Sequence, residues 1–124
     1  MKYIETDFLH ISIMDDRTAL VEAVYGVEID LEKSKYANEL IEKEMPGDYG
    51  TIIDRKADYS IVPGPVYDVL NALEKLKAIA IVVHNKKNFL PESMEKSMYK
   101  EKLGMFNSIK KALEWMASVL NSLR

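Results

Sequence analysis

An unbroken apolar run from Ala78 to Val83 constrains the fold of this 124-residue chain more than any other feature. A strand with one face in water alternates polar and apolar side chains, so a continuous run predicts a parallel central strand covered on both faces. The run ends at His84 and Asn85, and it is too short to span a bilayer. We therefore expect an α/β domain with helices packed against a mostly parallel sheet.

Two segments near the N-terminus alternate apolar and polar residues instead. Phe8 to Met14 and Ala19 to Tyr25 each have the period of a half-buried strand, and the polar triplet from Asp15 to Arg17 lies between them. This pattern predicts an antiparallel β-hairpin. Its exposed edge is compatible with a homodimer, because unpaired strand edges can pair with a second chain.

Helical spacing of apolar residues predicts about four helices in the rest of the chain. Asp30 is the expected N-cap of the first helix, Pro63 suits the first position of the second, and Ser108 or Asn107 precedes the last. The remaining expected elements are short strands at 49–54 and 105–106 and a weaker helix at 92–102. The prediction is one domain over residues 1–124, an N-terminal β-hairpin followed by βα units in a mixed five-stranded sheet.

The absence of cysteine removes several classes of function at once. Disulfide frameworks, thiol nucleophiles, iron–sulfur clusters and thiolate zinc sites are excluded, and a reducing cytoplasm is the expected location. The only histidines are His10 and His84, so a histidine-rich metal cage is excluded as well. We expect a protein that is not an enzyme, with no cofactor and no metal.

Charge is distributed unevenly along the chain. Residues 1–62 carry 7 basic and 14 acidic side chains, whereas residues 63–124 carry 10 basic and 6 acidic ones, and the formal net charge is −3. A mildly acidic protein is not expected to bind nucleic acid, but its basic half can attract an acidic partner. The acidic N-terminal segment does not match a signal peptide, and no membrane insertion is expected.

One candidate pocket lies at the ends of two predicted strands. Asp54 ends one strand, and His84 and Asn85 follow the apolar run. Ligands bind at the carboxyl ends of strands in open α/β sheets, so an acid–base pair is conceivable there. The alternative is a histidine whose hydrogen bonds are satisfied at the end of the strand and that has no chemical role.

Several segments together resemble the STAS-like domains related to bacterial anti-sigma-factor antagonists, especially the SpoIIAA-like branch sometimes grouped with Sec14-type lipid-binding domains. The resemblance covers almost the whole chain and is carried by residues 26–32, 52–54, 78–82 and 106–116. These are packing and turn patterns, so they indicate a fold more than an activity. The resemblance implies a non-enzymatic, bacterial regulatory module that docks to another protein.

In phospho-regulated members of that family a serine beside an aspartate is phosphorylated. The corresponding segment here makes Asp58, Tyr59, Ser60, Pro63 and Gly64 the candidate regulatory and partner-binding loop. Tyr59 separates Ser60 from Asp58, which departs from the family pattern. A capping or loop hydroxyl is the alternative role of Ser60.

The Sec14-type grouping implies a second function, a carrier or sensor of a small apolar or amphipathic ligand. Phe89, Met94, Met98 and Tyr99 form an adaptable apolar set that can serve as a lid, with a pocket beneath the helix around 92–102. Core filling is the other role for such residues.

Two-component receiver domains provide a third interpretation. Asp15, Asp16 and Asp54 occupy positions similar to the acidic residues of a phospho-acceptor site. This interpretation requires residues 16–25 to be helical, whereas their alternation favours a strand.

Overall fold

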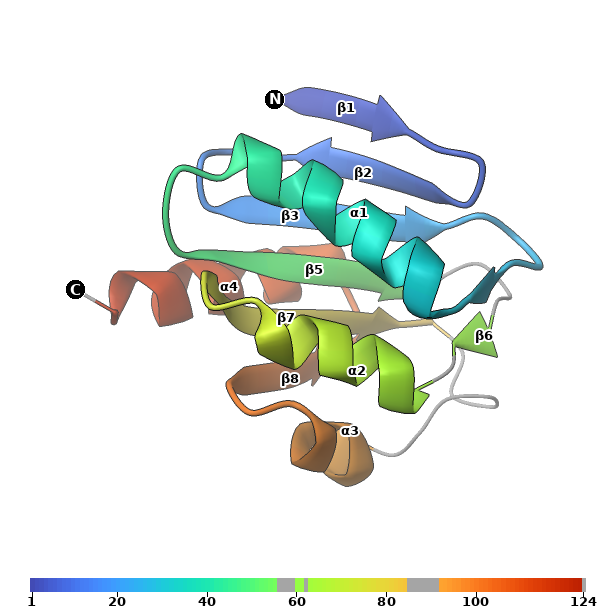
Figure 1. Cartoon of the computed structure of the whole chain (residues 1–124). Coiled ribbons are helices and arrows are strands. Elements are labelled where there is room, and N and C mark those ends of the chain that lie inside the picture. The colour runs from blue at the N-terminus through green and yellow to red at the C-terminus, as the bar shows by residue number, and fades with distance from the viewer. Residues whose placement is uncertain (56–59, 62, 85–91, 124) are drawn as a thin grey trace.

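Six strands form the central sheet of the computed structural model, which describes residues 1–55, 60–61, 63–84 and 92–123 (Figure 1). In spatial order they are β1 (Lys2–Glu5), β2 (Leu9–Ile13), β3 (Thr18–Ala23), β5 (Tyr49–Arg55), β7 (Leu76–Val83) and β8 (Lys102–Phe106). The first three pair antiparallel, and β3, β5, β7 and β8 run parallel. The sheet is therefore mixed and mostly parallel, as the sequence predicts.

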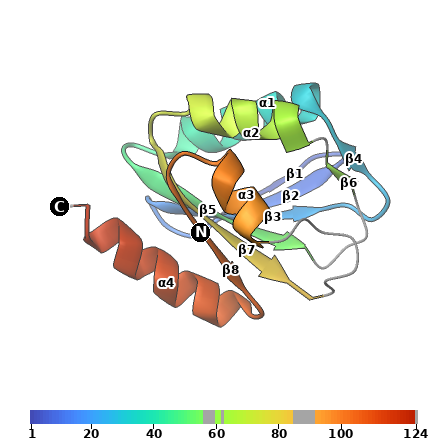
Figure 2. The same cartoon turned by 90° about the horizontal axis from the view of Figure 1, so that it is seen from below.

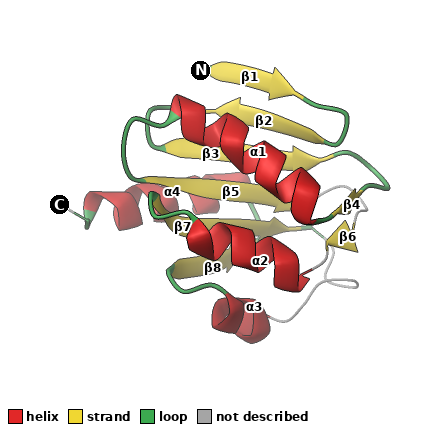
Figure 3. Cartoon of the chain, in the orientation of Figure 1, coloured by secondary structure: helices red, strands yellow, loops and turns green. Residues whose placement is uncertain are grey.

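Helices cover the two faces of this sheet unequally. α1 (Leu31–Glu44), α2 (Pro63–Ala72) and α3 (Glu92–Met98) lie on one face, and α4 (Ile109–Asn121) lies on the other (Figure 2). Two short strands, β4 (Glu28–Ile29) and β6 (Ser60–Ile61), pair in parallel just before α1 and α2 (Figure 3). This pairing joins the segments that lead into the two helices.

The central strand β7 is buried on both faces, which confirms the prediction from its apolar run. Ile79 and Ile81 pack in the core beneath α1 and α2, whereas Ala80 and Val82 pack in a second core beneath α4. Successive side chains of a strand point to opposite faces, so covering both faces requires a continuous apolar sequence.

The expected helix caps are confirmed by their hydrogen bonds. The side chain of Asp30 accepts from the backbone N–H of Lys33 at 3.0 Å, and that of Ser108 accepts from Lys111 at 3.2 Å. The Lys33 N–H also lowers the pKa of the Asp30 carboxyl. Pro63 is the first residue of α2, where its missing N–H leaves no hydrogen bond unmade.

The sheet has one strand more than the five that were expected. β1 pairs with β2 from Lys2 to Glu5, and its mostly exposed polar side chains hide the period-two signal of a strand. β8 begins at Lys102 rather than at Met105, because its pairing with β7 extends over residues whose own pattern is weak. α3 accordingly ends at Met98.

Candidate functional site

The last two residues of β5 place charged side chains on opposite faces of the sheet. Ile52 packs beneath α4 and Ile53 packs against the core beneath α1 and α2, and Asp54 and Arg55 continue this alternation. Both side chains are almost completely buried, at 1% and 4% exposed. Buried charges require partners, and each of these residues has one.

Asp54 contacts His84, the acid–base pair expected at the ends of these two strands. The Nε2 atom of His84 lies 2.7 Å from Oδ1 of Asp54, and the histidine side chain is 44% exposed. A buried carboxylate thus orients an accessible imidazole, an arrangement that is chemically able to accept or donate a proton. Asn85, the third residue expected in this pocket, lies outside the described residues.

Polar residues lie in line with Asp54 on the next two strands of the sheet, β3 and β2. Glu22 lies opposite Asp54 on the parallel neighbour, and His10 lies opposite Glu22 on the antiparallel one. Within residues 1–55, 60–61, 63–84 and 92–123, no three histidine or acidic side chains are placed to hold a metal ion.

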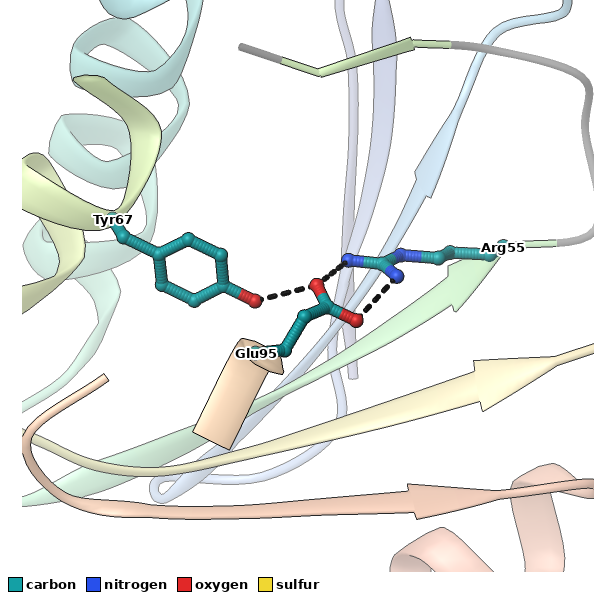
Figure 4. A network of polar contacts seen from close by, with 3 residues as sticks. All are labelled: Arg55, Tyr67 and Glu95. Atoms are coloured by element: carbon teal, nitrogen blue, oxygen red, sulfur yellow. Dashed lines mark hydrogen bonds and ion pairs between the residues drawn. The ribbon is translucent and has the colours of Figure 1, made fainter. Parts of the chain in front are cut away.

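Arg55 belongs to a buried polar network on the other face of the sheet (Figure 4). Its Nη1 and Nη2 atoms donate to the two carboxylate oxygens of Glu95 at 2.9 and 2.6 Å, and the hydroxyl of Tyr67 donates to Oε1 at 2.7 Å. Glu95 is fully buried. The network connects β5, α2 and α3 through one carboxylate.

Burial, reinforced by the adjacent Glu95 carboxylate, raises the pKa of Tyr67. The phenol is therefore a hydrogen-bond donor at neutral pH. This network could not be predicted from the sequence, because a glutamate in a short helix has no local feature that marks it as buried. Arg55 and Glu95 are 40 residues apart, and only the packing of α3 against α2 and the sheet brings them together.

A mainly apolar cavity of about 80 Å³ lies between α1, α2 and the sheet. Arg55 and Tyr67 border it, which places the buried network at one wall. The apolar lining includes Leu9, Val21, Ile41, Ile53, Val66 and Leu70. This cavity lies beneath α1 and α2, and the pocket expected under the helix around 92–102 stays a prediction.

The proposed lid residues have different environments. Met94 is 48% exposed, Met98 packs against the core, and Tyr99 is buried with its hydroxyl donating to the Leu76 carbonyl at 3.0 Å. The hydrogen bond and the burial of Tyr99 correspond to the core-filling role. Phe89 lies outside the described residues.

Only part of the candidate regulatory loop falls in the described structure. Ser60 belongs to β6, where its backbone pairs with Glu28, and Pro63 and Gly64 begin α2. Asp58 and Tyr59 lie outside the described residues. A role for this loop stays a prediction.

The receiver interpretation is wrong. Residues 18–23, which it requires to be helical, form β3. The turn that contains Asp15 and Asp16 precedes Thr18, which pairs with Gly50 at the start of β5, whereas Asp54 lies at the opposite end of that strand. The acidic residues therefore lie at opposite edges of the sheet, separated by more than ~10 Å at about 3.3 Å per strand residue.

No helix in the described part of the chain is both long enough and apolar enough to cross a membrane.

Comparison with solved structures decides the fold. A protein from Shewanella loihica PV-4, described as an uncharacterized member of the DUF3478 family with a SpoIIAA-like fold, superposes with a TM-score of 0.61. The match covers 91% of this chain and 98% of that one at 13% identity. This chain has a SpoIIAA-like fold. The family resemblance noted in the sequence is thereby supported at the level of the SpoIIAA-like fold. No protein-family model and no curated protein matches the sequence.

Proposed function

We propose that this SpoIIAA-like domain is a non-enzymatic binding module, a carrier or sensor of a small apolar or amphipathic molecule. The observation that carries the proposal is the cavity between α1, α2 and the sheet, with its apolar lining and its polar wall at Arg55 and Tyr67. Ligand sites in proteins are commonly apolar hollows with a few placed polar groups.

The arrangement of the cavity wall supports binding rather than catalysis. Arg55 and Glu95 satisfy each other in a bidentate ion pair, so neither is poised to attack a substrate or to transfer a proton. The accessible imidazole of His84 lies on the opposite face of the sheet from the cavity, next to Asp54.

Filling the cavity is the direct test. Ala37 on α1 lines the cavity and is 4% exposed, so Ala37→Leu places three additional carbon atoms in that space. Ala72, an exposed residue of α2, provides the matched control Ala72→Leu. Each protein is purified under native conditions, extracted with solvent, and its retained small molecules are identified by mass spectrometry.

We expect a compound in near-stoichiometric amount with the native protein and with Ala72→Leu, and its loss from Ala37→Leu. Circular dichroism confirms that both variants fold. Equal retention by Ala37→Leu and the native protein contradicts binding in this cavity, and so does the absence of any compound from all three proteins.

We also propose a regulatory role through protein–protein interaction, which the edge strand β1 favours. Its side chains are mostly exposed, and its outer edge faces no other strand of the described sheet. Such an edge can accept a strand from a partner, and a second copy of this chain is the simplest one. The candidate loop from Asp58 to Gly64 stays a further prediction for docking.

Self-association tests the role of β1. Tyr3 is 56% exposed on this strand, so Tyr3→Lys adds a charge to the edge while Tyr25→Lys changes an exposed tyrosine after β3. In sedimentation velocity we expect a concentration-dependent dimer for the native protein and Tyr25→Lys, and a monomer for Tyr3→Lys. A native protein that stays monomeric at all concentrations argues against pairing through β1.

A further inference from the structure

A buried hydroxyl in the cavity floor has no hydrogen-bond partner among the residues that the structure describes. Thr51 on β5 is 5% exposed and lines the cavity, and its Oγ1 atom makes no hydrogen bond to these residues. Its register neighbours on the same face are Ala19 and Ile79, whose side chains offer no polar atom. A buried hydroxyl without a partner costs free energy, and a polar group of a ligand in the cavity would remove that cost by hydrogen bonding to Thr51.

Each of the other polar side chains of the cavity wall has at least one hydrogen-bond partner. Arg55 is held by both oxygens of Glu95, Tyr67 donates to the same carboxylate, and the Asn38 amide donates to the Ser34 carbonyl at 2.8 Å. Among the described residues that line the cavity, the one charged side chain, Arg55, is already paired with Glu95. Burying an ionised ligand without a charge partner costs far more than burying a neutral polar group.

Size narrows the ligand further. The volume of about 80 Å³ limits the ligand to a short chain. A threonine hydroxyl both donates and accepts, so an alcohol or carbonyl oxygen satisfies it.

We infer that the cavity selects a neutral, short-chain molecule that carries one hydroxyl or carbonyl oxygen, and that Thr51 binds this oxygen. This inference rests on the proposed ligand-binding function and specifies its chemistry. Thr51 is a specificity residue, because it favours a polar ligand over an apolar one. Charged ligands are excluded because the Arg55 charge is already paired with Glu95.

Three compounds of equal chain length test the charge selection. n-Butanol, butyrate and n-butylammonium are titrated into the protein, and binding is followed by methyl NMR. The reporting methyl groups are those of Val21 and Ile53 at the cavity, and the buried methyl groups of Val119 and Leu120 on α4 are internal controls. We expect n-butanol alone to shift the cavity methyl signals, with the controls unchanged.

Two variants test Thr51. Thr51→Val keeps the shape and removes the hydroxyl, whereas Thr51→Ser keeps the hydroxyl. We expect Thr51→Val to weaken n-butanol binding about five- to tenfold, the loss of one hydrogen bond, and Thr51→Ser to retain most of the affinity. Thr51→Val also raises the urea midpoint of unfolding, because it removes a buried hydroxyl that has no partner.

Each contrary outcome has a distinct meaning. Equal n-butanol affinity in the native protein and Thr51→Val overturns the role of Thr51 but leaves the cavity as a binding site. Tighter binding of butyrate or n-butylammonium overturns the neutral class. If none of the compounds shifts a cavity methyl signal, the cavity holds water only and the inference fails. The proposed function is tested separately, by whether the native protein retains a compound during purification.

Discussion

At the scale of single residues, the end of β5 shows how alternation separates two sites. Asp54 and Arg55 are consecutive, yet they contact His84 on one face and Glu95 on the other. The first pair could be predicted, because both residues follow strands that end at the same edge of the sheet. The second could not, because the burial of Glu95 depends on where a short helix packs.

The buried network predicts unequal effects of mutation on stability. Glu95→Ala leaves the Arg55 guanidinium buried without its carboxylate, and we expect a loss of about 3–5 kcal/mol in the free energy of unfolding. Tyr67→Phe removes one hydrogen bond to a charged group and is expected to cost about 1.5–3 kcal/mol. Both are measured by urea denaturation.

An exposed ion pair provides the control for this prediction. Lys77 and Glu101 approach to 3.7 Å with side chains that are 29% and 38% exposed, so Glu101→Ala is expected to cost less than about 1 kcal/mol. A loss for Glu95→Ala no larger than that for Glu101→Ala contradicts the buried arrangement.

At the scale of elements, the approach of α4 to the sheet depends on a residue without a side chain. A Cβ atom added at Gly50 on β5 collides with the Met116 side chain of α4, and it lies 3.3 Å from the Ala78 carbonyl oxygen of β7. Met116 is fully buried, so its end has little room to move. The sequence marks α4 clearly as amphipathic, but it does not indicate which strand residue the helix approaches.

We therefore predict that Gly50→Ala lowers the free energy of unfolding by about 1–3 kcal/mol, the usual cost of overpacking a core. Gly47→Ala is the matched control, because a Cβ added there has no atom within 4 Å, and we expect a change within about 0.5 kcal/mol. Thermal and urea unfolding measure both. Equal stability of the two variants would show that α4 shifts to accommodate the methyl group.

At the scale of the whole molecule, three buried tyrosines link stability to alkaline pH. Burial raises the pKa of each phenol, with further contributions from Glu42 at Tyr49, Glu95 at Tyr67 and Glu101 at Tyr99. In the unfolded chain a tyrosine loses its proton near pH 10. Between that pH and the higher pKa values of the folded state, the folded protein retains more protons, so increasing pH favours unfolding.

We expect stability to be independent of these groups below about pH 10 and to fall above it by up to ~1.4 kcal/mol per pH unit for each tyrosine. Urea midpoints measured across this range test the slope. Tyr99→Phe removes one of the three groups and should reduce that slope by about one third. Phenolate absorbance from the three buried tyrosines that increases while the circular dichroism stays native contradicts the prediction.

Local sequence patterns predict the order and type of most elements, the cap Asp30, either Ser108 or Asn107 as the last cap, and the burial of β7 on both faces. These features depend on the spacing of neighbouring residues, so they can be recognised locally. The edge strand β1 was missed, because its few polar residues form a strand only by pairing with β2.

Two features depend on tertiary packing: the position of the cavity, and the lack of a partner for the Thr51 hydroxyl among the described residues. Thr51, Arg55 and Glu95 have ordinary sequence surroundings, and their roles follow from α1, α2 and α3 packing on one face of the sheet. Contacts between residues 28 and 40 positions apart depend on that packing, and no local spacing encodes it.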